Sequence, residues 1–307
     1  MLAAGLALAG PARATSNVSD IGMTAGQFLQ LGPGARAAAM GEAVAAAVDD
    51  ASALYWNPAA LTLIAGRSAT FMHSVYLAGS SFDYGAYGGR LGDCGAVGLS
   101  VQYFSAGSIT QTQNYAPVGT FAPYDLAVSA GYALTFRRTG LPLDDFSVGG
   151  SVKFIQSRIL ASAETGAVDF GVLSPAGLDD KLRLAFTWTN LGGTLRYEQA
   201  AESLPMAWRL GGAYRLDTPW LASADLSFPW GDKPYFALGT EYIFPYDKGL
   251  VFFSRAGYNS RTFASVTGFS GISFGAGFGF GRFDVDYALV PFGGLGQAHR
   301  ISLSGKF

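Results

Sequence analysis

Few residues in this chain of 307 could do acid–base or metal chemistry. It contains two histidines, His73 and His299, and one cysteine, Cys94. Nucleophilic and general-base catalysis need a histidine or carboxylate held beside a nucleophile, and no nucleophile motif lies beside either histidine in the sequence. We therefore expect no catalytic residue and no enzymatic activity, and we interpret both histidines as polar side chains lining an interior.

The other candidate sites have simpler interpretations. Asp49 and Asp50 offer carboxylate oxygens for a cation, but adjacent carboxylates more often cap a helix or pair with arginines, so we expect no metal site. The glycines at 277, 279 and 281 lack the spacing of a phosphate loop, and the pattern predicts no helix after them. With a net charge of −2 and no basic patch, the sequence also predicts no cofactor and no nucleic-acid partner.

The overall composition favours a membrane protein without spanning helices. Hydrophobic residues make up 50% of the chain, charged residues 14%, and the mean hydropathy is +0.25. Beyond the N-terminus, however, there is no charge-free apolar run of about 18 residues, the length a transmembrane helix needs. Because lipid admits only helices or closed barrels, the composition points to a β-barrel.

The last residues read as a transmembrane strand. Apolar Ile301, Leu303 and Phe307 alternate with Arg300, Ser302 and Ser304, which places one face toward lipid and the other toward a polar lumen. The alternative for this segment alone is an edge strand of a soluble sandwich.

Similar alternation recurs along the chain and predicts an antiparallel transmembrane β-barrel of about fourteen strands. An even count is typical of bacterial barrels. The predicted strands are 67–77, 82–91, 95–105, 125–137, 145–157, 166–173, 182–191, 206–216, 219–228, 235–244, 250–259, 270–281, 282–290 and 298–307. In an antiparallel barrel, every second connection lies at the same end. With both chain ends at the periplasmic side, the long connections 106–124, 192–205 and 260–269 fall on the extracellular side and short turns on the periplasmic side, as is typical of outer-membrane barrels.

Two segments precede the predicted barrel of residues 66–307. Residues 1–14 resemble a signal peptide for the general secretory pathway, because an apolar stretch from Leu2 to Ala9 is followed by Ala12-Arg13-Ala14, a cleavage pattern. The mature chain would begin near Thr15. Since no basic residue precedes the apolar stretch, we expect the true start to lie upstream.

Residues 15–65 are expected to form a partly helical hatch inside the lumen. The Ala-rich stretch 35–48 has a helical composition, interrupted by Gly41, and is too short to span a bilayer; the alternative is a surface helix outside the barrel. The predicted hatch residues, available for lumen binding, are Asp49, Asp50, Ser52, Tyr55, Trp56, Asn57 and Pro58.

Four segments resemble the PorV/PorQ family, a branch of the FadL-like outer-membrane barrels. They are residues 27–37, 40–43, 49–61 and 285–303, which together make 47 of the 307 residues; Asn57-Pro58-Ala59 is shared by the wider superfamily. The resemblance implies fourteen strands, an N-terminal hatch and a bacterial outer-membrane location. The likeness to outer-membrane proteins further implies that Ile301, Leu303 and Phe307 belong to the insertion signal.

Two functions follow as hypotheses. For the PorV branch, the resemblance implies an accessory role in type IX protein secretion, with a large secretion channel or a cargo bearing a C-terminal signal domain as partner. The alternative is a FadL-like transporter of hydrophobic small molecules, gated by the hatch. In both cases outer-membrane lipid surrounds the barrel, and an adhesive or structural barrel is a third hypothesis.

Overall fold

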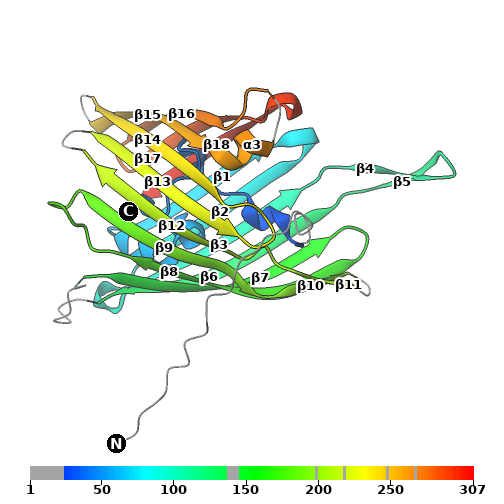
Figure 1. The fold of residues 1–307 in the computed structure, drawn as a ribbon, viewed down its shortest axis with the longest axis horizontal. Coiled ribbons are helices and arrows are strands. Elements are labelled where there is room, and N and C mark those ends of the chain that lie inside the picture. The colour runs from blue at the N-terminus through cyan, green and yellow to red at the C-terminus, as the bar shows by residue number, and fades with distance from the viewer. Residues whose placement is uncertain (1–23, 137–144, 198–199, 217–218, 247–248, 266–267) are drawn as a thin grey trace, which may run out of the picture.

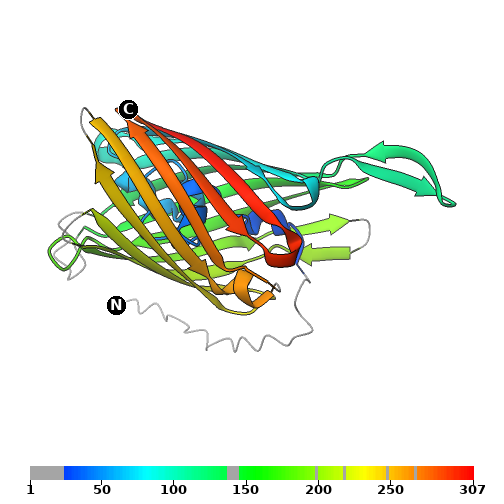
Figure 2. The same ribbon diagram turned by 90° about the horizontal axis from the view of Figure 1, so that it is seen from above.

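The computed structural model describes residues 24–136, 145–197, 200–216, 219–246, 249–265 and 268–307. Fourteen strands form one closed antiparallel barrel, shown from two sides in Figures 1 and 2. They are β1 (Arg67–Val75), β2 (Ser81–Arg90), β3 (Ala96–Ser105), β6 (Tyr124–Thr135), β7 (Ser147–Arg158), β8 (Ser162–Leu173), β9 (Leu182–Gly192), β12 (Ala207–Arg215), β13 (Trp220–Pro229), β14 (Tyr235–Pro245), β15 (Leu250–Asn259), β16 (Ile272–Phe280), β17 (Phe283–Pro291) and β18 (Gln297–Lys306). All fourteen predicted strands are confirmed, and the largest boundary difference is β8, which begins four residues earlier than expected.

The first and last strands close the barrel. β1 pairs with β18 so that His73 lies opposite Ile301. At the end of this pairing, Arg67 of β1 and Phe307, which follows β18, exchange backbone hydrogen bonds of 2.9 and 2.8 Å. Closure leaves the barrel sheet without an unpaired edge, which allows it to lie in hydrocarbon.

Along the barrel strands, most large apolar side chains face outward and most inward side chains are small or polar; Met72, Phe82 and Ile155 are large apolar exceptions that face the lumen. In β9, Leu184 and Trp188 are exposed while Ala185 and Thr187 are buried. In β18, Ile301 and Leu303 face outward. The two-sided alternation therefore describes the folded barrel.

The prediction that the histidines line the interior is wrong. His73 is 59% exposed on the outer wall, where its Nδ1 lies 2.6 Å from Asp83 Oδ1. His299 shares that outer face, with Nδ1 2.7 Å from Tyr287 Oη. Side chains alternate between the two faces of a strand, and each histidine stands an even number of positions from outward-facing residues. The alternation that predicts the strands therefore also predicts that both histidines face outward.

Long connections gather at one end of the barrel, as predicted. The connection 106–124 forms the hairpin β4 (Ile109–Gln113) and β5 (Ala116–Phe121), and 192–205 forms β10 (Thr194–Tyr197) and β11 (Ala200–Ser203). Both hairpins project from the end opposite the C-terminus in Figure 1. We call the hairpin end the outer end.

Residues 24–65, here called the hatch, lie inside the barrel (Figure 2). The hatch contains short helical turns: η2 (Gln27–Gln30), α1 (Ala35–Ala39), α2 (Ala53–Trp56) and η3 (Pro58–Leu63). Within the Ala-rich stretch 35–48, helix α1 stops just before the interruption expected at Gly41. It ends at Ala39 because Gly41 and Glu42 adopt positive φ angles of 64° and 70°, which an α-helix cannot continue.

Across the described residues, every helix is too short or too polar to cross a membrane. The predicted signal peptide, residues 1–14, and residues 15–23 of the predicted hatch lie outside the described residues.

The lipid-facing wall generates a stability prediction. Leu210 lies in the middle of β12 and Leu216 follows that strand at the turn, with nearly equal exposed fractions of 46% and 45%. Leu210→Arg should lower the free energy of unfolding by about 2–4 kcal/mol, whereas Leu216→Arg near the interface should cost about 0–1 kcal/mol. Urea titration in lipid vesicles measures both, and equal losses would contradict the membrane placement.

Candidate functional site

The hatch fills the lumen with its own apolar core. Leu54, Trp56, Leu61 and Ile64 are almost completely buried and belong to one hydrophobic cluster with inward-facing alanines of the wall. Burying such a large apolar side chain contributes about 1.5–3 kcal/mol. Small wall residues leave the room that these larger hatch side chains occupy.

At two points the hatch backbone lies directly against the wall. A Cβ atom at Gly149 in β7 would lie 2.5 Å from Ala59 N, and one at Gly239 in β14 would lie 2.6 Å from Met40 O. Both distances are shorter than van der Waals contact. Glycine is therefore required at these wall positions for the hatch to dock as it does.

Asn57 fixes the turn that carries the predicted hatch residues. It is fully buried, its Oδ1 accepts from Ala59 N at 3.1 Å, and its Nδ2 donates to Ala45 O and to Val172 O of β8 at 3.1 and 3.3 Å. Pro58 follows as the first residue of η3, where its fixed φ suits a helical turn. Asn57 and Pro58 therefore join two hatch segments to the barrel wall.

Tyr55 and Trp56, which precede Asn57, donate side-chain hydrogen bonds to backbone carbonyl oxygens of the hatch. Trp56 Nε1 donates to Pro33 O at 3.0 Å, and Tyr55 Oη donates to Leu29 O at 2.9 Å. Asp50 Oδ1 accepts from Ser52 N at 2.8 Å and from Ser52 Oγ at 2.5 Å. The structure thus gathers the seven predicted residues in the lumen, and ligand binding by them stays a prediction.

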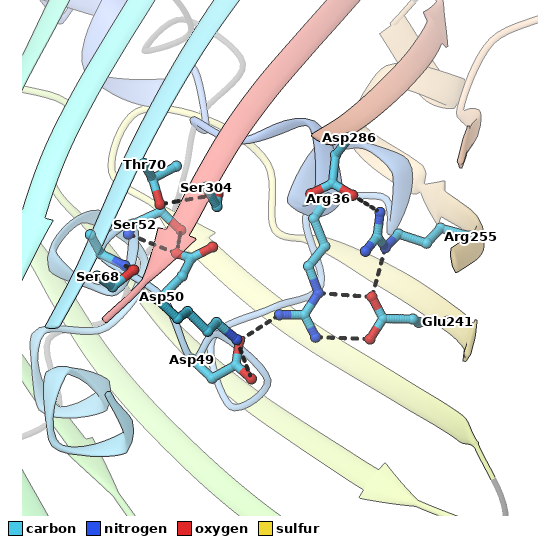
Figure 3. Close-up of polar contacts among 12 residues, drawn as sticks. Arg36, Asp49, Asp50, Ser52, Ser68, Thr70, Glu241, Arg255, Asp286 and Ser304 are labelled. Atoms are coloured by element: carbon cyan, nitrogen blue, oxygen red, sulfur yellow. Dashed lines mark hydrogen bonds and ion pairs between the residues drawn. The ribbon is translucent and has the colours of Figure 1, made fainter. Parts of the chain in front are cut away.

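A network of ion pairs joins the hatch to barrel strands β14, β15 and β17, as Figure 3 shows. Arg36 of α1 donates to both carboxylate oxygens of Glu241 in β14, at 2.8 and 2.9 Å, and to Asp49 Oδ1 at 2.8 Å. Arg255 of β15 donates to Glu241 at 2.6 Å and to Asp286 of β17 at 2.5 Å. Each buried charge in this network has an opposite charge at hydrogen-bond distance, which offsets its desolvation.

The two adjacent aspartates of the hatch have different electrostatic surroundings. Burial raises the pKa of Asp50, although hydrogen bonds from Ser52 oppose the shift. Burial acts in the same direction on Asp49, but the charge of Arg36, assisted by Lys306, outweighs it and lowers the pKa of Asp49. Asp49 therefore serves as an ion-pair partner of arginine, the alternative that the sequence favoured over cation binding.

One motif was missed by the sequence reasoning. Gly271-Ile272-Ser273-Phe274-Gly275 matches the Gly-x-Ser-x-Gly pattern, but Ser273 lies in β16, and another strand follows instead of a helix. Its Oγ donates to Ala39 O and accepts from Gly41 N, at 3.1 and 3.2 Å. This serine therefore attaches the hatch to the wall.

A cavity of about 450 Å³ lies above the hatch toward the outer end. It is lined by hatch residues, among them Gln27, Gln30 and Glu42, and by residues between barrel strands, among them Asp232 and Arg261. Deeper in the lumen, two further cavities measure about 20 and 30 Å³, room for about one water molecule each. Within the described residues, no group of three or more histidine, cysteine or acidic side chains is arranged to hold a metal.

Comparison with known families decides the relationship. The sequence model of the family described as Type IX secretion system protein PorV matches residues 14–218, more than half of the chain. The chain belongs to the PorV family. The match spans the hatch and the barrel strands as far as β12, and it makes this chain an outer-membrane protein.

Solved structures share the fold of this PorV-family chain. The toluene transporter TbuX of Ralstonia pickettii has a TM-score of 0.54 at 14% identity, covering 90% of this chain and 98% of the transporter. The toluene transporter TodX of Pseudomonas putida gives 0.56 at 14% identity over 90% and 98%. A FadL homologue of Pseudomonas aeruginosa gives 0.58 at 12% identity over 89% and 98%. At these identities the likeness concerns the fold alone. A search of curated proteins gave no match.

The close approach of Gly149 to the hatch backbone can be tested with a matched pair of variants. Gly149 and Gly150 are neighbours in β7, but only Gly149 faces the hatch, and a Cβ atom at Gly150 would come no closer than 3.5 Å to a neighbouring atom. Gly149→Val should displace the hatch and speed its proteolysis, whereas Gly150→Val should not. Limited proteolysis of the refolded barrel measures this. Equal cleavage of the two variants would contradict the docked hatch.

The ion-pair network predicts a second effect. Glu241→Gln removes the carboxylate that Arg36 and Arg255 share. Because Arg36 keeps Asp49 and Arg255 keeps Asp286 as partners, the loss of stability should be at most about 3–5 kcal/mol, the cost of leaving a buried charge unpaired. The exposed Glu202 is the control, because Glu202→Gln should change stability by less than about 0.5 kcal/mol. Thermal unfolding in detergent compares the two variants. If Glu241→Gln is as stable as Glu202→Gln, Glu241 does not stabilise the fold through its ion pairs.

Proposed function

We propose that this barrel is a non-enzymatic accessory of type IX protein secretion that binds a partner protein at its outer end. The partner would be a large secretion channel or an exported cargo with a C-terminal signal domain. The family match supports this assignment. The observation that carries it in the structure is the β4–β5 hairpin, which projects from the outer end with nearly every side chain exposed.

The second outer hairpin has a different role. Leu195 of β10 and the nearby Leu204 are buried against Phe28 and Leu29 of the hatch, and Ala25 N donates to Ser203 O at 3.0 Å. The β10–β11 hairpin therefore holds the start of the hatch. This leaves β4–β5 as the outer hairpin that is free to contact another protein.

The packed lumen also favours function at the surface. Hatch side chains and the Arg36–Glu241 pair fill the space where a pore would run. A protein that works by binding partners needs no permanent channel, whereas a transporter must move its hatch aside in each cycle.

A transporter of hydrophobic small molecules is the second candidate. The 450 Å³ cavity beside the hatch favours it, because the volume suits a small ligand. Several cavity residues are charged, however, including Glu42, Asp232 and Arg261. Such a lining fits an apolar ligand less well than a polar one.

One pair of variants on the same membranes separates the two functions. Residues 106–124 are replaced by a short Gly/Ser linker, which removes the hairpin while preserving the barrel strands. We expect loss of the co-purifying secretion channel, identified by mass spectrometry, with unchanged uptake of a fluorescent hydrophobic probe. The unheated gel mobility of the folded barrel confirms assembly.

The matched variant is Asn57→Ala in the hatch. For a secretion accessory, this change should leave channel recovery within about twofold of the unmodified protein. Altered probe uptake with normal channel recovery, combined with no effect of the linker, would instead assign the transporter function.

A further inference from the structure

The β4–β5 hairpin forms a sheet of its own. It pairs with no other strand of the described chain, so its two outer edges carry free backbone groups. Every side chain of β4 is exposed. An isolated two-stranded hairpin has little apolar burial and is only marginally stable in water. The hairpin therefore lacks the packing that stabilises the rest of the fold.

The two edges of this hairpin are not equally protected. β5 carries Pro117, and the pairing shifts between Gln111 and Thr112 so that Val118 has no opposite residue. Proline and bulges are devices that prevent another strand from pairing with an edge. The β5 edge is thus blocked in two ways.

β4 has none of these devices. Its sequence, Ile109-Thr110-Gln111-Thr112-Gln113, contains no proline, glycine or charged residue, and the whole connection 106–124 contains no charge. Natural edge strands commonly carry lysine or another charge against unwanted pairing. An unprotected, regular edge on an exposed hairpin is a template for strand addition.

The hairpin tip points to the same use. Asn114 and Tyr115 form the two-residue turn with φ angles of 50° and 66°, a conformation for which Gly is the favoured second residue. A side chain in this region costs about 1–2 kcal/mol. Tyr115 is nevertheless fully exposed at the tip. An aromatic side chain held there at a cost in stability is suited to anchor a partner.

We propose that an extended, uncharged segment of the secretion channel adds to the hairpin as a third strand along β4, with Tyr115 contacting the channel beyond the strand. The inference rests on the proposed function and specifies how the partner is bound. Backbone hydrogen bonds would provide the contact, and the absence of charge on the hairpin matches a neutral segment. A second copy of this chain is the competing occupant.

Amide exchange of the purified complex tests the strand addition directly. In the complex with the channel, exchange of the peptide covering 109–113 should slow by about tenfold or more relative to the protein alone, because added pairing protects edge amides. The peptide covering 116–121 should change little. No slowing at 109–113 would overturn the proposal. Slowing in the protein alone, increasing with its concentration, would assign the edge to a second copy.

Matched lysine variants test which edge is used. Thr110→Lys with Thr112→Lys places two charges on β4; Ala116→Lys with Thr120→Lys places the same charge on β5, and Thr110 lies opposite Thr120. The β4 variant should weaken channel binding by about tenfold or more and the β5 variant by less than about threefold. Equal losses would show a general charge effect and overturn the assignment to β4.

Two further variants separate this inference from the proposed function. If the Gly/Ser replacement of 106–124 leaves channel binding intact, the proposed function itself fails. If that replacement removes binding but the β4 lysines do not, only strand addition fails. Tyr115→Gly should relieve the strain in the turn yet weaken channel binding by about fivefold or more. Unchanged binding would show that Tyr115 does not contact the channel.

Discussion

Pairing of the backbone in hydrocarbon is the constraint on which the rest of this structure depends. Every N–H and C=O group at membrane depth must have a partner within the protein, and the β1–β18 pairing completes the ring that provides them. Closure fixes which side chains face lipid and which face the lumen. It also brings residues far apart in the sequence to the same interior, where the hatch joins them.

The lumen uses small side chains on the wall and larger ones on the hatch. Gly149 allows Ala59 to approach as backbone against backbone, and Asn57 bonds to β8 from the same turn. On the opposite wall, Arg36 reaches Glu241 through two hydrogen bonds. Apolar packing on one side and buried ion pairs on the other hold the hatch inside the barrel.

The sequence was sufficient for the barrel but only partly for the hatch. Alternation with period two identifies strands regardless of what they pair with, which is why all fourteen were located. The sequence showed that Gly41 interrupts the Ala-rich stretch 35–48, but not the reason: Gly41 packs against the wall in a left-handed turn. The Arg36–Glu241 pair could not be predicted, because it joins positions 205 residues apart. The sides of the histidines were predictable from parity and were misassigned.

A hatch packed into the lumen supports our proposal that the protein acts through its outer surface and not as a channel. Conductance of the purified protein in a planar lipid bilayer tests this most directly. The packed hatch predicts no stable conductance steps from the intact barrel, and steps only when hatch docking is disrupted, as in Gly149→Val. A steady open pore in the unmodified protein would contradict closure of the lumen by the hatch.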